Sequence, residues 1–397
     1  MESMTFDFAL SGNKFKGLRT VCGVVGSGNL EIIVEENTTS NTRFEIETAI
    51  DHYAPIWRMV IESFVAEYQP VGLKFTLNDN GATPPVVSLR LRQAFETFNG
   101  YQKTASNYLE LDARERIKAI VDPRSFHEWL ADEEHYSPHL AALGLPGEAD
   151  DGIVIGSALF NNQNILIAAQ QKDFMGGAVG EVHGAKLTGL FKAAAKRGVK
   201  TVILLIDSGG VRLHEANAGE LAISETIRAI FEARNQGVMT VGVICGKNGA
   251  FGGMGIISAC LDYLIVNEIG RIGVSGADVI QAVKGVEVFD AQDRSLVWRV
   301  YGGKTRYLQH VVQAYVDSSM ESIKDALKEA MNKQKPINSD VLKEQHALLK
   351  KRFETTKGYQ EEGGYLAAKY PQLAPTLFDM DEVSFLRAAQ QIDQDEQ

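Results

Sequence analysis

Three glycine-rich segments could supply the chemistry of this chain: residues 174–180, 207–212 and 248–254. Glycine lets the backbone turn sharply and leaves amide N–H groups uncovered. Where a helix follows such a turn, its first N–H groups also point outward at the positive end of the helix dipole. Amides held in this way can stabilise the negative charge that develops on a carbonyl oxygen. A single such turn is more often a plain strand–helix connection, so the recurrence is what indicates a site.

Strands and helices must hold these segments in place. Largely apolar strands are expected directly before them, at residues 165–169, 201–206 and 238–245, as is typical of strands buried on both faces of a parallel sheet. Apolar residues recur at helical spacing after the first two segments, and Gly198 and Gly237 stand where those helices end. Strands that alternate with helices predict βαβ units in a largely parallel sheet.

The composition limits the classes of partner. The 397 residues carry a formal net charge of −11, which argues against nucleic acid or an anionic membrane as the main partner. No apolar run reaches the roughly 20 residues that span a bilayer, and the first residues do not resemble a signal peptide. Cys22, Cys245 and Cys260 suggest neither a disulfide framework nor zinc spacing, so we expect a cytoplasmic protein without a bound metal.

Residues 1–98 read as a small α/β domain with its own core. Strands are expected at residues 17–25, 30–34, 44–50 and 73–77, with helices from Pro55 and after Pro84. The residues Gly26-Ser27-Gly28-Asn29 signal a hairpin turn between the first two strands. Ser27 alone is a turn residue, but a serine exposed on a tight glycine turn is also within reach of a modifying enzyme.

The sequence around Ser27 resembles a known type of carrier. Residues 24–31, Val-Val-Gly-Ser-Gly-Asn-Leu-Glu, resemble the acyl-carrier (delta) subunit of biotin-independent malonate decarboxylase, and the resemblance extends over residues 5 to 98. In that family the matching serine carries a phosphoribosyl-dephospho-coenzyme A arm, so the resemblance implies this arm on Ser27. The Asp-Ser-Leu motif of helical acyl carriers does not occur, which agrees with a different type of carrier.

The glycine segments carry a second resemblance. Residues 172–177, 207–212 and 252–253, with the strand at 262–266, resemble the carboxyltransferase branch of the crotonase superfamily. Over residues 108 to 390 the chain is similar to the beta subunit of malonate decarboxylase. The implied fold class is α/β, with the small carrier domain followed by a ClpP/crotonase-type domain. The zinc ribbon that often precedes the acetyl-CoA carboxylase subunit of bacteria is absent, which weakens that assignment.

The expected organisation has four parts along the chain. They are a carrier domain at residues 1–98, a linker at 99–107, an enzyme domain at 108–390 and an acidic tail at 391–397. Residues 99–107 are polar and small without periodicity, as is usual for a linker. Such a fusion would hold carrier and enzyme at a high effective concentration.

The resemblance implies a mechanism in which malonyl thioester loses CO2 and the resulting enolate is protonated to acetyl thioester. The thioester carbonyl is the electron sink, so no metal or pyridoxal group is required. No biotin is expected as a cofactor either. The expected oxyanion donors are the amides of Gly209, Gly210, Gly252 and Gly253. Gly176 and Gly177 are expected to shape the channel that receives the prosthetic arm. For every one of these glycines, a purely structural role in a tight turn stays open.

The residue that protonates the enolate is left open. Four polar residues follow the first two glycine segments, namely Glu181, His183, His214 and Glu215. Such side chains are more often caps or solvated groups. Arg212 could bind a carboxylate or phosphate, or it could form a structural ion pair. The resemblance also implies partners: a gamma subunit that completes the site, an alpha subunit that exchanges acetyl for malonyl, and a prosthetic-group transferase.

Four other functions stay open. A biotin-dependent carboxyltransferase subunit, as in the sodium-pumping malonate system, would have a similar sequence. A carrier and scaffold subunit would leave all chemistry to its partners. A serine hydrolase would use Ser208, but Ile206 occupies the first glycine position of the Gly-x-Ser-x-Gly motif. A dinucleotide site at residues 26–31 lacks the last glycine of its fingerprint and a following helix pattern.

Overall fold

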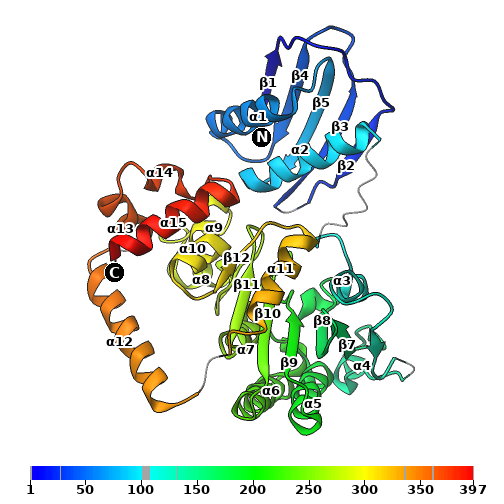
Figure 1. The fold of residues 1–397 in the computed structure, drawn as a ribbon, viewed down its shortest axis with the longest axis vertical. Coiled ribbons are helices and arrows are strands. Elements are labelled where there is room, and N and C mark those ends of the chain that lie inside the picture. The colour runs from blue at the N-terminus through cyan, green and yellow to red at the C-terminus, as the bar shows by residue number, and fades with distance from the viewer. Residues whose placement is uncertain are drawn as a thin grey trace. The chain divides into compact units, whose positions relative to one another are not determined.

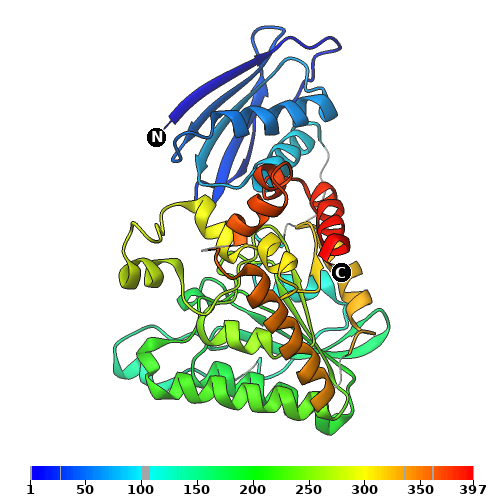
Figure 2. The ribbon, with the colours of Figure 1, turned by 90° about the vertical axis from the view of Figure 1, so that its left-hand side faces the viewer.

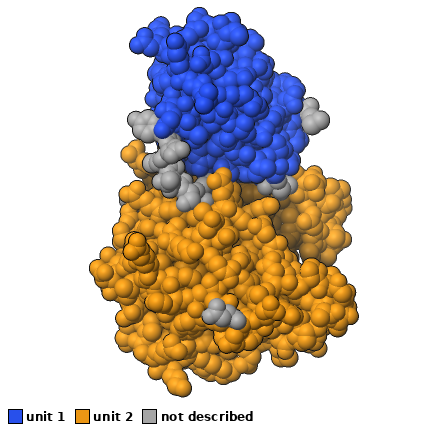
Figure 3. Space-filling model, turned by 90° about the vertical axis from the view of Figure 1, so that its right-hand side faces the viewer, with its two compact units in different colours: residues 1–105, 379–381 blue, residues 106–378, 382–397 orange. Residues whose placement is uncertain are grey.

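The protein is described here by a computed structural model that covers residues 2–26, 28–100, 108–131, 133–334, 337–359 and 362–396. It divides into two compact units (Figures 1 and 3). The smaller unit comprises residues 1–105 with 379–381, and the larger comprises residues 106–378 with 382–397. The division falls in the expected linker, of which residues 101–107 lie outside the described residues.

The smaller unit is a five-stranded sheet with two helices. Its strands are β1 (Glu2–Phe8), β2 (Thr20–Gly23), β3 (Asn29–Glu36), β4 (Thr42–Thr48) and β5 (Leu73–Asn80), in the order β1-β4-β5-β3-β2. Its helices are α1 (Ala54–Tyr68) and α2 (Pro84–Phe98). β4 and β5 are parallel and the other pairs are antiparallel. The predicted hairpin between β2 and β3 is confirmed, since these strands pair directly.

Several strands of the smaller unit differ from the expectation: β2 is shorter than residues 17–25, and β4 begins and ends two residues before the expected 44–50. Strand β1 was not expected, although alternate residues of this segment, such as Phe6, face the core. Strand β5 continues through Asn80, three residues beyond the expected end, because the alternation of buried positions extends from Leu77 to Asp79. The buried Asp79 carboxylate accepts a hydrogen bond of 2.7 Å from Thr48 Oγ1, which gives this polar residue a partner inside the strand.

The larger unit is built on a seven-stranded sheet in the order β12-β11-β10-β9-β8-β7-β6. The strands are β6 (His127–Glu128), β7 (Ile153–Phe160), β8 (Gln163–Gln170), β9 (Thr201–Leu205), β10 (Met239–Ile244), β11 (Tyr263–Val266) and β12 (Ala314–Tyr315). Strands β8 to β12 are parallel, and β6 and β7 are antiparallel at one edge. The predicted largely parallel sheet is therefore confirmed.

Helices cover both faces of this sheet. Alternate strand residues on one face of the sheet, such as Ile167, Ile203 and Val243, form a core cluster with α3 (Ala113–Ile120) and α11 (Met320–Ala330). Helices α5 (Glu181–Arg197) and α6 (Asn217–Asn235) lie side by side and contact strands β7 to β10 (Figures 1 and 2). As predicted, Gly198 ends α5 with φ +67, and Gly237 follows α6 with φ +81.

The remaining helices are short or peripheral. They are α4 (Pro138–Ala142), α7 (Gly252–Ala259), α8 (Ala277–Lys284), α9 (Arg294–Tyr301), α10 (Gly303–Leu308), α12 (Ser339–Thr356), α13 (Glu362–Lys369), α14 (Ala374–Leu377) and α15 (Glu382–Glu396). Helix α12 buries none of its residues, so it does not cover the sheet. Helix α15 continues through Glu396 and so includes most of the residues expected to form the acidic tail at 391–397. Within the described ranges, no helix combines the length and apolarity that a bilayer crossing requires.

Candidate active site

The three glycine segments lie side by side beyond the carboxyl ends of β8, β9 and β10. Single parallel bridges join Val179 to Val211, and Ser208 to Ala250. The first two segments are tied by hydrogen bonds from Gly209 N–H to Gly176 O, 2.9 Å, and from Val179 N–H to Gly210 O, 2.8 Å. The segments are thus joined to one another by isolated bridges and main-chain hydrogen bonds.

The first and second segments touch most closely at Gly177. A Cβ added to this residue would lie 2.0 Å from the carbonyl oxygen of Asp207, and its φ is +68. Both the contact and the left-handed backbone therefore require glycine. At Gly176 an added Cβ would meet nothing within 4 Å, so this residue is open to space.

The second and third segments meet in the same way. Ser208 N–H donates to Gly249 O at 2.7 Å, and Phe251 N–H donates back to Ser208 O at 3.1 Å. A Cβ added to Gly252 would lie 3.2 Å from Gly210 Cα, so the two backbones are in direct contact there. Amides from two different strand ends are in this way brought to one place.

The four expected oxyanion donors separate into two pairs. The N–H groups of Gly209 and Gly252 already donate to main-chain carbonyls. Gly209 donates to Gly176 O at 2.9 Å, and Gly252 donates to Val274 O at 3.0 Å. Among the described residues, the one acceptor of the Gly210 N–H is the Ser208 hydroxyl, at 3.2 Å. Gly253 lies in the first turn of α7, and its N–H meets no acceptor among the residues that the structure describes. Of the four expected donors, the N–H groups of Gly210 and Gly253 are therefore the two without a main-chain acceptor among the described residues.

Ser208, the alternative nucleophile, is fully buried. Its hydroxyl donates to Gly210 O at 3.3 Å and accepts from Gly210 N–H. A nucleophilic serine needs a base within hydrogen-bond reach. Within the described part of the chain, no base is hydrogen-bonded to this hydroxyl, and the geometry gives Ser208 a role in shaping the turn.

His183, one of the four candidate proton donors, is buried and neutral. Its Nε2 lies 3.2 Å from Gln170 Nε2, and its backbone N–H donates to Asp151 Oδ2 at 2.9 Å. Burial, followed by the positive charges of Arg212 and Lys186, lowers the pKa of His183 well below its usual value. A neutral imidazole without access to solvent is a poor source of the proton that the enolate needs.

Arg212 forms a structural ion pair, one of the two roles left open for it. Its guanidinium is buried and contacts the carboxylates of Asp151, at 2.8 Å, and Glu215, at 3.0 Å. These carboxylates also accept the N–H groups of Glu181, at 2.6 Å, and His183 at the start of α5. Burial raises the pKa of Asp151, and Arg212 opposes this rise. The ion-pair cluster of Arg212, Asp151 and Glu215 therefore stabilises the start of α5, the helix that follows the first glycine segment.

The other three candidate proton donors differ in their exposure to solvent. Glu215 belongs to the buried cluster around Arg212. Glu181 is half exposed and lies 3.2 Å from His139, while His214 is exposed. Of the four, only Glu181 and His214 can exchange a proton with solvent or substrate.

A buried polar cluster beneath the second and third segments was not expected. Asp207 Oδ2 lies 2.8 Å from Arg116 Nη1, and its Oδ1 accepts Asn248 N–H at 2.6 Å. The Arg116 guanidinium stacks on Tyr108, 4.3 Å from the ring centroid. Burial raises the pKa of the Tyr108 phenol and of the Cys245 thiol, so both stay protonated. A polar residue at the end of a buried strand, such as Asp207, is the signal that could have indicated this cluster.

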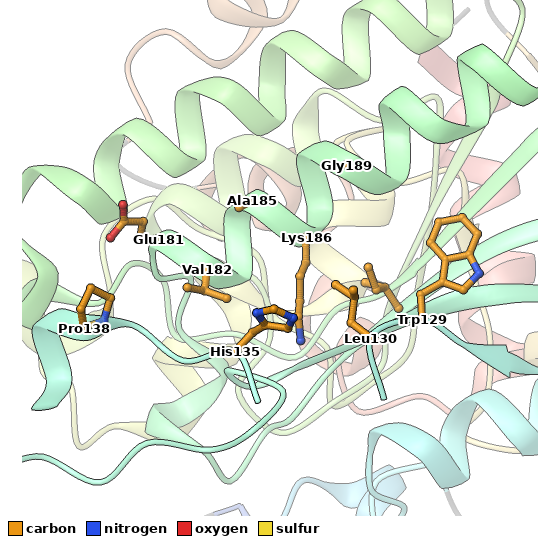
Figure 4. A pocket seen from close by; sticks show the side chains of 10 residues that line it. Trp129, Leu130, His135, Pro138, Glu181, Val182, Ala185, Lys186 and Gly189 are labelled. Carbon is orange, nitrogen blue, oxygen red and sulfur yellow. The ribbon is translucent and has the colours of Figure 1, made fainter. Parts of the chain in front are cut away.

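A pocket of about 740 Å³ lies beside the first turns of α5 (Figure 4). Trp129, Leu130, Pro138 and Val182 give it apolar walls, and Lys186 reaches it from α5. The Lys186 ammonium donates to Asp150 O at 2.7 Å, and burial lowers its pKa. None of the pocket residues belongs to the three glycine segments, so the pocket is separate from the amide site.

The expected attachment residue of the smaller unit, Ser27, lies outside the described residues. The residues on either side of it are anchored: Gly28 N–H donates to Asn80 O at 2.9 Å, and Asn29 Oδ1 accepts from Arg90 Nε at 3.1 Å. A Cβ added to Gly26 would meet nothing within 4 Å. The described neighbours of residue 27 are therefore anchored on its C-terminal side and have open space beside Gly26.

No group of His, Cys, Asp or Glu side chains suited to a metal ion is present among the described residues. What the larger unit offers is a crotonase-type carboxyltransferase fold, in which the backbones of two glycine turns are in direct contact. The smaller unit adds a carrier-like domain to it.

Comparisons with known proteins identify both parts. The model of the malonate decarboxylase delta subunit family matches residues 18–98, and that of the carboxyl transferase domain matches residues 110–303. The malonyl-S-ACP:biotin-protein carboxyltransferase of Malonomonas rubra is 38% identical over 217 residues, 51% of this chain and 68% of the relative. The malonate decarboxylase acyl carrier protein of Acinetobacter calcoaceticus is 38% identical over 101 residues, 25% of this chain and 99% of the relative.

A solved structure agrees with these matches. One chain of a Pseudomonas malonate decarboxylase hetero-tetramer in complex with malonate superposes with a TM-score of 0.61 at 32% identity, covering 66% of this chain and 96% of that one. The chain therefore belongs to the malonate decarboxylase family, as a fusion of the acyl-carrier (delta) unit with a carboxyl transferase domain.

Proposed function

We propose that this chain carries a malonyl or acetyl thioester on a prosthetic arm at Ser27 and decarboxylates the malonyl thioester at the glycine turns. The observation that carries the proposal is the contact between the second and third glycine segments, where a Cβ added to Gly252 would lie 3.2 Å from Gly210 Cα, in a chain that also contains its own carrier domain. When bound, the phosphoribosyl-dephospho-coenzyme A arm supplies the thiol that forms the thioester. The proposed boundaries are residues 1–98, 99–107 and 108–390.

In the proposed decarboxylation, the main task of the protein is to stabilise the negative charge on the thioester oxygen. The bond between the carboxylate carbon and the α-carbon breaks, CO2 leaves, and the electron pair moves onto the thioester oxygen as an enolate. The Gly210 and Gly253 N–H groups stabilise that oxygen, and the loss of one such donor typically costs about 3–4 kcal/mol. A proton delivered to the α-carbon then gives the acetyl thioester. Gly176 and Gly177 shape the adjacent wall, where Gly176 leaves open space.

Partner subunits form the next part of the proposal. Helix α8 fully buries none of its residues, and Val274, Val279 and Val283 near the third glycine segment are more than half exposed. Exposed apolar patches usually mark interaction sites. The similar Pseudomonas enzyme is a hetero-tetramer. We propose a gamma subunit on this surface, an alpha subunit that exchanges acetyl for malonyl, and a transferase that loads Ser27.

The decisive experiment is the intact mass of the chain co-expressed with its neighbouring genes, followed by digestion to locate any adduct. A phosphoribosyl-dephospho-coenzyme A adduct on Ser27 that is absent from Ser27→Ala supports the proposal. An unmodified Ser27 in cells that consume malonate contradicts the carrier role.

A second candidate is carboxyl transfer to biotin, without release of CO2 at this site. It is favoured by the similarity to the malonyl-S-ACP:biotin-protein carboxyltransferase. The two reactions can be separated with a carboxyl-labelled malonyl thioester. Label that appears as CO2 and is insensitive to avidin indicates direct decarboxylation, whereas label on a biotin carrier protein indicates transfer.

A further inference from the structure

One side-chain amide connects the first and second glycine segments. Gln170 is the last residue of β8 and is 3% exposed. Its Oε1 accepts the backbone N–H of Asp207 at 2.9 Å. Its Nε2 lies 3.4 Å from Gly177 O and 3.2 Å from His183 Nε2. A single planar group therefore contacts the first segment, the start of the second segment and helix α5.

The orientation of this amide follows from its partners. A backbone N–H can only donate, so the group that faces Asp207 must be the carbonyl oxygen Oε1. The NH2 group must then face Gly177 O and His183, and His183 Nε2 must accept. The imidazole proton accordingly lies on Nδ1, which has no hydrogen-bond partner among the described residues. A protonated His183 would direct an N–H at the Gln170 NH2 group, so this arrangement favours the neutral ring.

The contact continues from Asp207 to the third segment. Asp207 Oδ1 accepts the N–H of Asn248, and Gly209 and Gly210 follow Asp207 within three residues. Any change in the distance between β8 and residue 207 would therefore move the Gly210 amide relative to Gly176 and Gly253. Displacement of a reacting group by about 1 Å can lower a rate by about 100-fold.

We propose that Gln170 is a positioning residue that fixes the spacing of the glycine segments and thereby the direction of the Gly210 amide. Gln170 acts through the backbone and does not contact the reacting atoms. The effect on catalysis rests on the proposed function, whereas the effect on the backbone does not.

The test compares Gln170→Met with Gln163→Met in the full chain. Methionine has nearly the length of glutamine but makes none of the three contacts. Gln163 is the matched control because it lies on the same strand and is exposed. For malonyl thioester decarboxylation we expect kcat of Gln170→Met to fall about 30- to 100-fold with KM changed less than about threefold. Gln163→Met should match the parent chain.

A second readout does not depend on activity. Hydrogen exchange measured on peptides that cover residues 174–180 and 206–213 should accelerate in Gln170→Met and stay unchanged in Gln163→Met. In Gln170→Glu the carboxylate still accepts Asp207 N–H but now attracts a proton on His183 Nε2. The 15N shifts of His183 in that variant should be those of an imidazolium at neutral pH.

The outcomes separate the two proposals. Unchanged exchange and a kcat within about twofold of the parent would overturn the role of Gln170. Lower stability with an unchanged kcat would also overturn it, because the residue would then be only structural. If the parent chain releases no CO2 but the exchange and the His183 shifts change as expected, the positioning role stands and the decarboxylation proposal fails.

Discussion

At the scale of single residues, neighbouring glycines differ in whether their backbone N–H groups already have a hydrogen-bond acceptor. Gly252 gives its N–H to Val274 O, whereas the next residue, Gly253, keeps its N–H free of acceptors within the described ranges. A sequence pattern cannot separate these two residues, because both are glycines in one Gly-Gly pair. Only the path of the backbone after Phe251 decides which amide points away from the protein.

The Gly253 amide can be removed without removing the helix. Proline lacks the N–H group but is tolerated in the first turn of a helix, and Gly253 lies in the first turn of α7. We expect Gly253→Pro to have a kcat about 100- to 1,000-fold below that of Gly253→Ala, which keeps the donor. Both variants place a Cβ near the end of the Ile223 side chain, 2.6 Å away before relaxation. Equal kcat values in the two variants would rule out Gly253 as an oxyanion donor.

The buried His183 predicts how stability depends on pH. The folded state holds this ring neutral, with a lowered pKa, while the imidazole of the unfolded chain binds a proton below its ordinary pKa of 6.5. The unfolded state then binds more protons, so the free energy of unfolding falls as pH drops below about 6.5, by up to about 1.4 kcal/mol per pH unit. This contribution is fully present above pH 6.5 and is lost progressively towards the lowered pKa of the folded state.

The variant His183→Gln keeps an acceptor for Gln170 but does not titrate. Urea unfolding between pH 5 and 7 should show a smaller slope in this variant than in the parent chain. His214→Gln is the control for the loss of an exposed imidazole. An unchanged slope in His183→Gln would mean that His183 is charged in the folded protein.

At the scale of elements, the start of α5 is held by charges that come from three separate segments. Arg212 follows β9, Asp151 precedes β7, and Glu215 lies next to the start of α6. Together they bind two N–H groups of the first turn of α5, which otherwise have no partner. The first and second glycine segments are thus joined by side chains as well as by backbone.

Removal of the guanidinium should be costly. Arg212→Met leaves two buried carboxylates without their countercharge, and breaking a buried pair in this way typically costs about 3–5 kcal/mol. Equilibrium unfolding in urea measures the change. Arg228→Met is the matched control, because Arg228 pairs with Glu225 and Glu232 on the exposed face of α6 and should show no measurable change. A similar stability for both variants would contradict a structural role for Arg212.

The sequence predicted the regular elements better than the polar clusters. The strands before the glycine segments and the glycines at the ends of α5 and α6 are found as expected, because apolar runs and terminal glycines are local signals. Strand β1 was missed. Gln170, Asp151 and Arg116 were not anticipated, since their partners are distant in the sequence and only the fold brings them together.

At the scale of the whole molecule, two units with separate cores share one chain. The smaller unit buries its own set of aromatic and aliphatic side chains, including the stacked pair Phe44 and Phe75. A domain with its own core is expected to fold alone. A fragment of residues 1–100 should therefore unfold cooperatively on heating, followed by circular dichroism, and residues 108–397 serve as the complementary fragment. A fragment of residues 1–100 without a cooperative transition would contradict two independent cores.

The presence of both units on one polypeptide has a consequence for the supply of the protein. Each round of translation makes one carrier-type domain and one carboxyltransferase-type domain, so no change in gene expression can alter their ratio. A cell in which these domains are separate proteins can adjust the amount of each one. An intact copy of one protein also stays usable when a copy of the other is damaged. Here a mutation that unfolds or truncates one domain also affects the supply of the other domain. Selection therefore acts on the two domains together.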